Sequence, residues 1–144
     1  MPARDRYHDC VKAALEREGW TITHDPLRLR WGARDMYVDL GAETLLAAEL
    51  GATRIAVEIK SFLGPSPVTE LERALGQYVL YQDLLQQIHA GRTLFLAVPR
   101  GSYEGIFRDP LGELLLQNRR IMLIVVDPAR EEITQWIPQR PGAP

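Results

Sequence analysis

Two charged side chains interrupt the apolar segment 55–60, and their types could support phosphodiester chemistry. Ile55, Val57 and Ile59 alternate in the pattern of a half-buried β-strand, so Glu58 and Lys60 share the opposite face. A carboxylate can hold a divalent metal ion, and an ammonium can stabilise the charge that develops on a phosphate. The alternative is an ordinary Glu–Lys pair on the polar face of an edge strand, where such a pair contributes little.

Asp39 and Gln77 extend this pair to a candidate site. Asp39 lies in a second apolar segment, 36–40, and could join Glu58 in binding Mg²⁺, with Mn²⁺ as a substitute. Gln77 falls in a predicted helix beside Gly76, which would let the helix approach the sheet closely. Its amide could orient a water molecule or a phosphate, although a solvent-facing glutamine would look the same in sequence. We therefore predict metal ligands at Asp39 and Glu58, with Lys60 and Gln77 completing the catalytic set.

Other acidic and histidine residues are weaker candidates. Glu43 and Glu49 flank the segment that follows Asp39, and Glu16 lies on the first predicted helix, so any of them could add a ligand. Surface carboxylates are common, and a structural role is the simpler interpretation for all three. The neighbours His24 and Asp25 could form a catalytic pair, but Asp followed by Pro is more typical of a turn that ends a strand.

Hydrophobic periodicity and turn residues predict an α/β chain. Ser66 and Pro67 have the residue types of a helix N-cap and first helical position. The expected elements are a helix over 5–18, strands over 20–24 and 36–40, a short helix over 41–50, a central strand over 54–62, a helix over 67–90, a buried strand over 92–98, two helical pieces over 103–118, a strand over 121–126 and an edge strand over 133–137. An extended segment over 27–31 and a turn over 32–35 precede the second strand. This order predicts a single domain over 1–137, a mixed sheet flanked by helices, with a flexible tail over 138–144.

Composition fits a soluble protein without an evident nucleic-acid signature. The 144 residues include 17 Lys and Arg against 19 Asp and Glu, for a net charge of -2. Arginine groups at 28–34 and 119–120 are best interpreted as solvated surface, and Trp20, Trp31 and Trp136 as core or interface residues.

Cysteine content and the amino terminus bear on location. Cys10 is the single cysteine, so no internal disulfide can form, as is usual in a reducing compartment. No signal peptide and no apolar run approaching ~18 residues is present, so we expect a cytoplasmic protein with no membrane segment.

Several strings along the chain resemble the XisH family, the fdxN element excision controlling factor proteins of cyanobacteria. They are GWTITHDP at 19–26, YVDLGAE at 37–43, IAVEIKSF at 55–62, ALGQY at 74–78 and RTLFLAVP at 92–99, with Trp136-Ile137 near the end. The resemblance implies a restriction-endonuclease-like core of the PD-(D/E)xK nuclease-like superfamily. It places the metal-binding acids of that superfamily on Asp39 and Glu58, its lysine on Lys60, and the helix glutamine of its resolvase-like branches on Gln77.

The same resemblance implies a biological setting. The family is named for programmed excision of a DNA element during heterocyst differentiation, a DNA recombination event in which XisI is the expected protein partner and DNA the expected substrate. A toxin–antitoxin or defence-like role with XisI is a further possibility that the resemblance suggests.

Two hypotheses of different classes remain open. The first is a Mg²⁺-dependent DNA endonuclease-like protein that uses Asp39, Glu58, Lys60 and Gln77. The second is a non-catalytic regulatory protein on a nuclease scaffold, acting through XisI or the recombination machinery. Mild acidity favours the second and the intact charged set favours the first, while homo-oligomer formation is left open.

Overall fold

A six-stranded mixed β-sheet forms the centre of the computed structural model, which describes residues 6–35 and 45–142. The strand order is β1-β4-β5-β6-β7-β8. Their bounds are β1 Thr21–His24, β4 Leu45–Leu50, β5 Thr53–Ile59, β6 Arg92–Pro99, β7 Leu123–Asp127 and β8 Glu132–Ile137. The central strands β5, β6 and β7 run parallel and the outer pairs are antiparallel. The predicted mixed sheet is confirmed, with β8 at the predicted edge.

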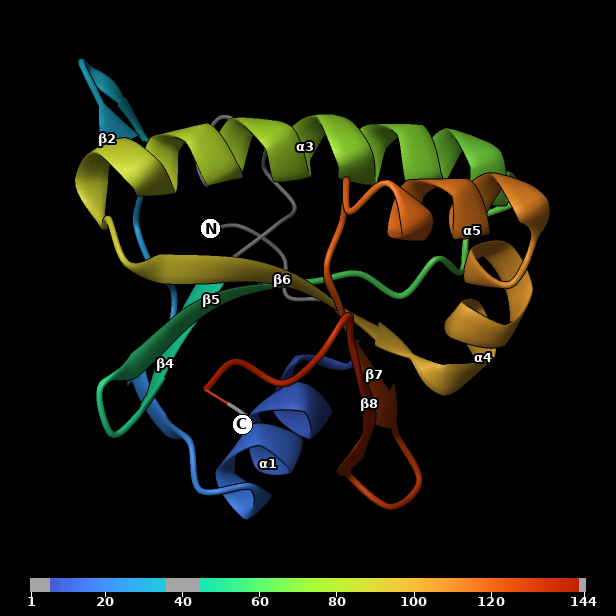
Figure 1. Ribbon diagram of the computed structural model, residues 1–144, viewed down its shortest axis with the longest axis horizontal. Coiled ribbons are helices and arrows are strands. Elements are labelled where there is room, and N and C mark those ends of the chain that lie inside the picture. Colours follow the sequence, from blue (N-terminus) through green and yellow to red (C-terminus); the bar gives the residue numbers. More distant parts are fainter. Residues whose placement is uncertain (1–5, 36–44, 143–144) are drawn as a thin grey trace.

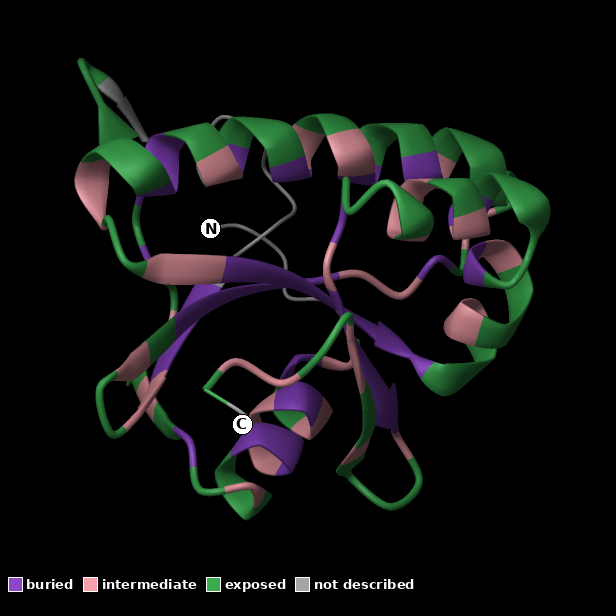
Figure 2. Cartoon of the chain, in the orientation of Figure 1, coloured by how far each residue is buried: buried purple, intermediate pink, exposed green. Residues whose placement is uncertain are grey.

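Helices cover both faces of this sheet, as predicted (Figure 1). Helix α3 (Pro67–Ile88) lies across one face with α5 (Pro110–Gln117) beside it, and α1 (His8–Arg17) covers the opposite face. Each face carries its own hydrophobic core, and the central strands are buried from both sides (Figure 2). Within the described ranges, no helix combines the length and apolar character that crossing a bilayer requires.

The predicted start of α3 is confirmed. Ser66 is the N-cap residue, and its hydroxyl oxygen accepts a hydrogen bond from the backbone N–H of Thr69 at 3.4 Å. Pro67 occupies the first helical position, where its missing N–H has no intrahelical partner to lose. Local sequence therefore fixes where this helix begins, four residues before Leu71, its first buried residue.

The helix predicted over 41–50 is wrong where the structure describes it, because residues 45–50 form strand β4. This strand pairs antiparallel with β5, from Leu45 opposite Glu58 to Leu50 opposite Thr53. Ala47 and Ala48 are fully buried in the two different cores, one on each face of the sheet. Backbone pairing and burial on two faces outweigh the helical preference of alanine and leucine. The strand predicted over 36–40 lies outside the described residues.

The helical segment after β6 is divided into short pieces, as predicted. These are α4 (Arg100–Ser102), the π-helix η1 (Tyr103–Phe107) and α5. Gly112 lies in the first turns of α5, and a Cβ there would stand 2.1 Å from the carbonyl oxygen of Ile106. Glycine is therefore required because α5 packs directly on the backbone of η1.

A small hairpin stands apart from the main sheet. Strands β2 (Arg30–Trp31) and β3 (Arg34–Asp35) pair antiparallel through a two-residue turn, and Gly32 in that turn has a φ of +61°. Of the two predicted places for Trp31, core or interface, the structure excludes the core, because 54% of its surface is exposed. The other tryptophans do lie there: Trp20 packs on Trp136 at 5.7 Å between ring centroids, and Phe95 packs on Trp136 at 5.1 Å.

An ionic cluster ties the start of α1 to the end of β1. His8 is buried, and its Nε2 lies 2.9 Å from Oδ1 of Asp25. Lys12, one turn later, donates a hydrogen bond to Oδ2 of the same carboxylate at 2.7 Å. Burial acts to raise the pKa of Asp25, but the hydrogen bond from Lys12 and the interaction with His8 outweigh it and hold the pKa below its ordinary value of 3.8.

We predict that Asp25→Asn lowers the free energy of unfolding by about 1–3 kcal/mol at neutral pH, because His8 and Lys12 lose a charged acceptor. A carboxylate whose folded pKa is depressed stabilises the fold above the unfolded pKa and loses that effect as pH falls through the folded pKa. The difference between the two proteins should therefore shrink below about pH 4. Urea unfolding at several pH values measures it, with exposed Asp83→Asn as control; a constant difference would contradict the ionic explanation.

Candidate active site at the carboxyl end of strand β5

Glu58 lies in the middle of the sheet and is fully buried, with 0% of its surface exposed. Its neighbours across the sheet are Leu45 on β4 and Leu96 on β6. Ala56, two residues earlier on the same face, belongs to the core beneath α3, whereas Val57 belongs to the opposite core. The face predicted for Glu58 is thus the α3 face, and it is covered rather than open to solvent.

Lys60 follows on the same face and meets the helix above it. Its Nζ donates a hydrogen bond to Oε1 of Gln77 at 3.3 Å, and both side chains are half-buried. The prediction placed Gln77 over the Glu58–Lys60 face, and the structure brings Lys60 and Gln77 together from elements 17 residues apart. The end of strand β5 is thus joined by a side-chain hydrogen bond to the helix that covers it.

The chain is firmly held where it leaves this strand. The backbone N–H of Lys60 donates to the carbonyl of Ala97 on β6 at 3.0 Å. The hydroxyl of Ser102 donates to the carbonyl of Ser61 at 2.6 Å. Phe62 then adopts a φ of +56°, unusual for a residue with a side chain, and packs edge-on against Phe107 at 5.4 Å. These contacts fix the backbone around Lys60 from two sides.

Tyr78, adjacent to Gln77, bridges two strands under α3. Its hydroxyl donates to the carbonyl of Leu94 at 2.7 Å and accepts from the backbone N–H of Met122 at 3.2 Å. Burial raises the pKa of this phenol to about 12; the bond from Met122 opposes that shift, and the carboxyl group of Glu58 adds to it. The tyrosine therefore holds the register of α3 over the candidate site.

The other predicted acids that the structure describes lie away from Glu58. Glu49 pairs with Arg54 on β5, four register positions from Glu58, and its Oε1 lies 3.3 Å from Arg92 and 3.5 Å from Arg54. Glu49 therefore does not join Glu58. Glu16 is exposed on α1, which covers the other face. Among residues 6–35 and 45–142, no group of three or more His, Cys, Asp or Glu could hold a metal. Asp39 and Glu43 lie outside the described residues.

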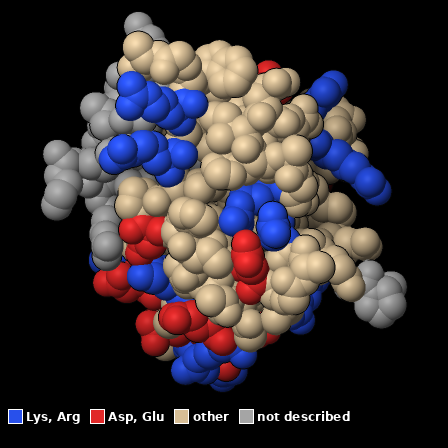
Figure 3. All heavy atoms as spheres, turned by 90° about the vertical axis from the view of Figure 1, so that its left-hand side faces the viewer, with Lys and Arg blue, Asp and Glu red and all other residues tan. Residues whose placement is uncertain are grey.

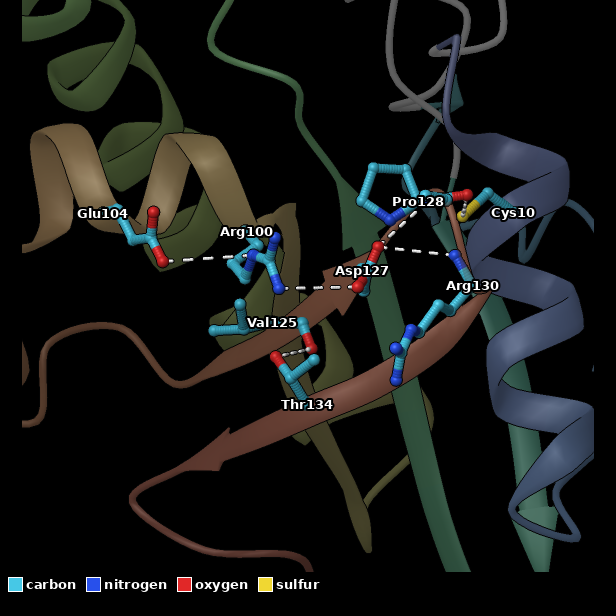
Figure 4. Close-up of polar contacts among 9 residues, drawn as sticks. Cys10, Arg100, Glu104, Val125, Asp127, Pro128, Arg130 and Thr134 are labelled. Atoms are coloured by element: carbon cyan, nitrogen blue, oxygen red, sulfur yellow. Dashed lines mark hydrogen bonds and ion pairs between the residues drawn. The ribbon is translucent and has the colours of Figure 1, made fainter.

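Sequence reasoning did not identify a second charged group at the same edge of the sheet. Asp127 ends β7 and is buried, and its Oδ2 lies 3.4 Å from a guanidinium nitrogen of Arg100, the first residue after β6 (Figure 4). The other oxygen accepts from the backbone of the turn after β7, including Arg130 at 3.3 Å. Glu104 lies 3.9 Å from Arg100 on its exposed side. The sequence signal for this group was a charged residue at the end of each predicted parallel strand, because the carboxyl ends of such strands lie at one edge of the sheet.

Cys10 and His8 show two more features that the sequence left undecided. Cys10 lies near this turn, with its sulfur 3.9 Å from the carbonyl of Pro128. Burial raises the pKa of the thiol, and Glu131 and Asp127 raise it further, which disfavours the reactive thiolate. His8 was not a candidate, yet it pairs with Asp25; its place on the buried face of α1, with Val11, was the available signal.

The comparisons with known proteins agree on one family. The chain matches the XisH protein family over residues 1–134. A crystal structure of an XisH family protein from Nostoc punctiforme PCC 73102 superposes with a TM-score of 0.83 at 36% identity, covering 92% of this chain and 99% of that one. An fdxN element excision controlling factor protein from Anabaena variabilis superposes with a TM-score of 0.81 at 36% identity, covering 91% and 97%. No curated protein matches.

We predict that Tyr78→Phe lowers the free energy of unfolding by about 1–3 kcal/mol, because Leu94 and Met122 each lose a buried hydrogen-bond partner. A phenol whose folded pKa is raised favours the folded state fully below its unfolded pKa of 10.0, and this contribution disappears as pH rises toward about 12. Urea unfolding of both proteins between pH 8 and 12, with Tyr7→Phe as control, measures the effect. Equal pH dependence of wild type and Tyr78→Phe would contradict the assignment.

Proposed function

Because the chain belongs to the XisH family, we propose that it acts in the controlled excision of a DNA element, the role that names its Anabaena variabilis relative. We further propose that it does so through an endonuclease-like site on the α3 face. The observation that carries this proposal is the convergence of a carboxylate, a cation and an amide on that face, with Lys60 held by Gln77 at 3.3 Å beside the strand that bears Glu58. The mixed sheet with helices on both faces supports a restriction-endonuclease-like core.

The donor chemistry at this site is of the kind that Mg²⁺ or Mn²⁺ binds. Glu58 offers hard oxygen atoms, the ligand type that both ions prefer, and Asp39 is the proposed second acid. A bound divalent ion would lower the pKa of a water molecule and screen the phosphate charge. The side chains of Lys60 and Gln77 have complementary tasks that they perform themselves. The ammonium stabilises negative charge on the scissile phosphate, and the NH₂ group of Gln77, unused in its bond to Lys60, donates to water or to a phosphate oxygen.

A second candidate function rests on the burial of Glu58. A carboxylate with 0% exposure, enclosed between the sheet and the helix layer, is less accessible than a working metal ligand usually is. A catalytic site must admit water and substrate. The alternative is therefore a regulatory protein that keeps the scaffold and acts by binding XisI or components of the recombination machinery. In that case Glu58, Lys60 and Gln77 would maintain the position of α3 and would not turn over substrate.

We predict nicking of supercoiled or branched DNA by the purified protein in the presence of Mg²⁺ or Mn²⁺. Lys60→Ala should lower the rate about 100-fold, as loss of a charge-stabilising group at a reacting phosphate does, and Gln77→Ala should lower it about tenfold. The matched control is Gln86→Ala, an exposed glutamine on the same helix. Absence of cleavage on every substrate, together with XisI binding that survives Lys60→Ala, would establish the regulatory alternative.

Metal binding can be tested separately from catalysis. We predict that calorimetric titration of Mn²⁺ gives saturable heat with the wild type and that Glu58→Gln weakens the affinity by at least about tenfold, because it removes a charged oxygen ligand. Exposed Glu72→Gln on α3 is the control with the same chemical change. Indistinguishable titrations for the wild type and both variants would argue against a metal ion at Glu58.

A further inference from the structure

The β2–β3 hairpin has a fixed base and an exposed tip. Leu27 and Leu29, just before β2, are buried in the core beneath α3 and anchor the segment. Beyond them the chain extends past the carboxyl end of α3, so the hairpin projects from the body of the molecule (Figure 1). The turn at Gly32 faces open space, with no atom within 4 Å of the position a Cβ would take. The hairpin is therefore a projection that is anchored at its base and open to solvent at its tip.

The charge on this projection is entirely positive up to its last residue. Arg28 and Arg30 are exposed and alternate with the buried leucines. Arg34 adds a third arginine in the sequence, while the first acid is Asp35. The whole chain has a net charge of -2, so a seven-residue stretch with three arginines is a local reversal of sign. Arginine guanidinium groups match phosphate oxygens in charge and geometry.

The surface around the hairpin continues this pattern. Figure 3 shows the side of the molecule on which α3 ends, where Lys and Arg side chains lie at the height of α3 and most acidic side chains lie lower. The basic side chains at this height are thus separated from most of the acidic ones, an arrangement that favours anions beside the hairpin.

Trp31 adds a large aromatic surface at the tip, where 54% of the residue is exposed. It follows Leu27 and Leu29 in alternation, but the hairpin has by then passed beyond α3, so more than half of the residue is open to solvent. An exposed aromatic ring beside arginines is the combination that single-stranded nucleic acids use, through stacking of bases and contacts to phosphates. A two-stranded ribbon also fits the major groove of a duplex.

We infer that the β2–β3 hairpin is a DNA-contacting projection, in which Arg28 and Arg30 bind backbone phosphates and Trp31 packs against bases or sugars. This inference rests on the proposed function, to which it adds a substrate-binding surface separate from the Glu58–Lys60–Gln77 site. Self-association through the hairpin is disfavoured, because a two-fold contact would place the arginines of one copy against those of the other. An acidic protein partner is the competing occupant, and the experiment below separates it from DNA.

The experiment measures DNA binding without cleavage, in EDTA, by fluorescence anisotropy of a labelled duplex and of a gapped form with unpaired bases. Arg28→Gln with Arg30→Gln should raise Kd about tenfold and lower the salt dependence, log K against log[salt], by about 2 units. The control is Arg119→Gln with Arg120→Gln, the other exposed arginine pair, which removes the same charge and should leave both quantities unchanged. Arg28→Lys with Arg30→Lys keeps the charge and should keep most of the affinity.

Trp31 is tested by its own signal. DNA should quench the tryptophan fluorescence of the wild type, and Trp31→Ala should abolish the quenching because Trp20 is buried and Trp136 packs in the core. We expect Trp31→Ala to weaken binding of the gapped DNA at least several-fold more than binding of the duplex, since stacking needs an unpaired base. Thermal unfolding should be unchanged, because the side chain is exposed.

Clear results would overturn the inference. DNA that fails to bind, or that binds equally to the hairpin variants and to the Arg119→Gln, Arg120→Gln control, rules it out. So does loss of XisI binding or of a dimer in Trp31→Ala with DNA binding intact, which identifies a protein interface instead. The inference and the proposed function fail separately: hairpin-dependent binding without any cleavage refutes only the nuclease, and Lys60-dependent cleavage that is indifferent to the hairpin refutes only the DNA contact.

Discussion

The position of α3 across the three parallel strands is the constraint on which the rest of the structure depends. Tyr78 sets it by joining the backbone of Leu94 on β6 to that of Met122, just before β7, through one buried hydroxyl. With α3 fixed there, Gln77 stands over Lys60, and Glu58 is enclosed beneath the helix. Removing the hydroxyl would leave two backbone groups without partners in a region from which water is excluded, so packing and polar pairing are coupled at this point.

Burial changes sharply along β5, and this gradient defines the character of the candidate site. Glu58 is completely enclosed, while Lys60, two residues on, is half-buried at the sheet's carboxyl edge. Arg100 follows β6 and Asp127 ends β7 at that edge. Polar side chains therefore gather where the parallel strands end, as in other α/β sheets. The charged groups of the sheet are thus arranged by strand direction: Glu58 is enclosed, and the outer groups Arg100 and Asp127 form an ion pair.

The Lys60–Gln77 contact and the β2–β3 hairpin are attached to the fold in different ways. The half-buried Lys60–Gln77 hydrogen bond joins the end of a central strand to the helix that covers it, so packed elements hold both partners. Leu27 and Leu29 anchor the base of the β2–β3 hairpin in the core, whereas Trp31 near its tip is exposed to solvent. The two XisH crystal structures superpose over more than nine-tenths of this chain, so the overall architecture is shared with them.

The sequence by itself determined the elements whose signals are local: the N-cap at Ser66, the alternation in β5, the buried run of β6 and the face shared by Glu58 and Lys60. Tertiary structure decided the rest. Residues 45–50 became a strand because β5 offered hydrogen bonds and the two cores bury apolar side chains from both faces of the strand. Helix propensity reports neither the pairing nor the burial. Trp31 is exposed because the hairpin passes beyond the end of α3, and His8 is an ion-pair partner because α1 lies beside the end of β1. Periodicity reports which side of an element is apolar, but only the packed fold settles what covers that side, since coverage depends on residues far away in the chain.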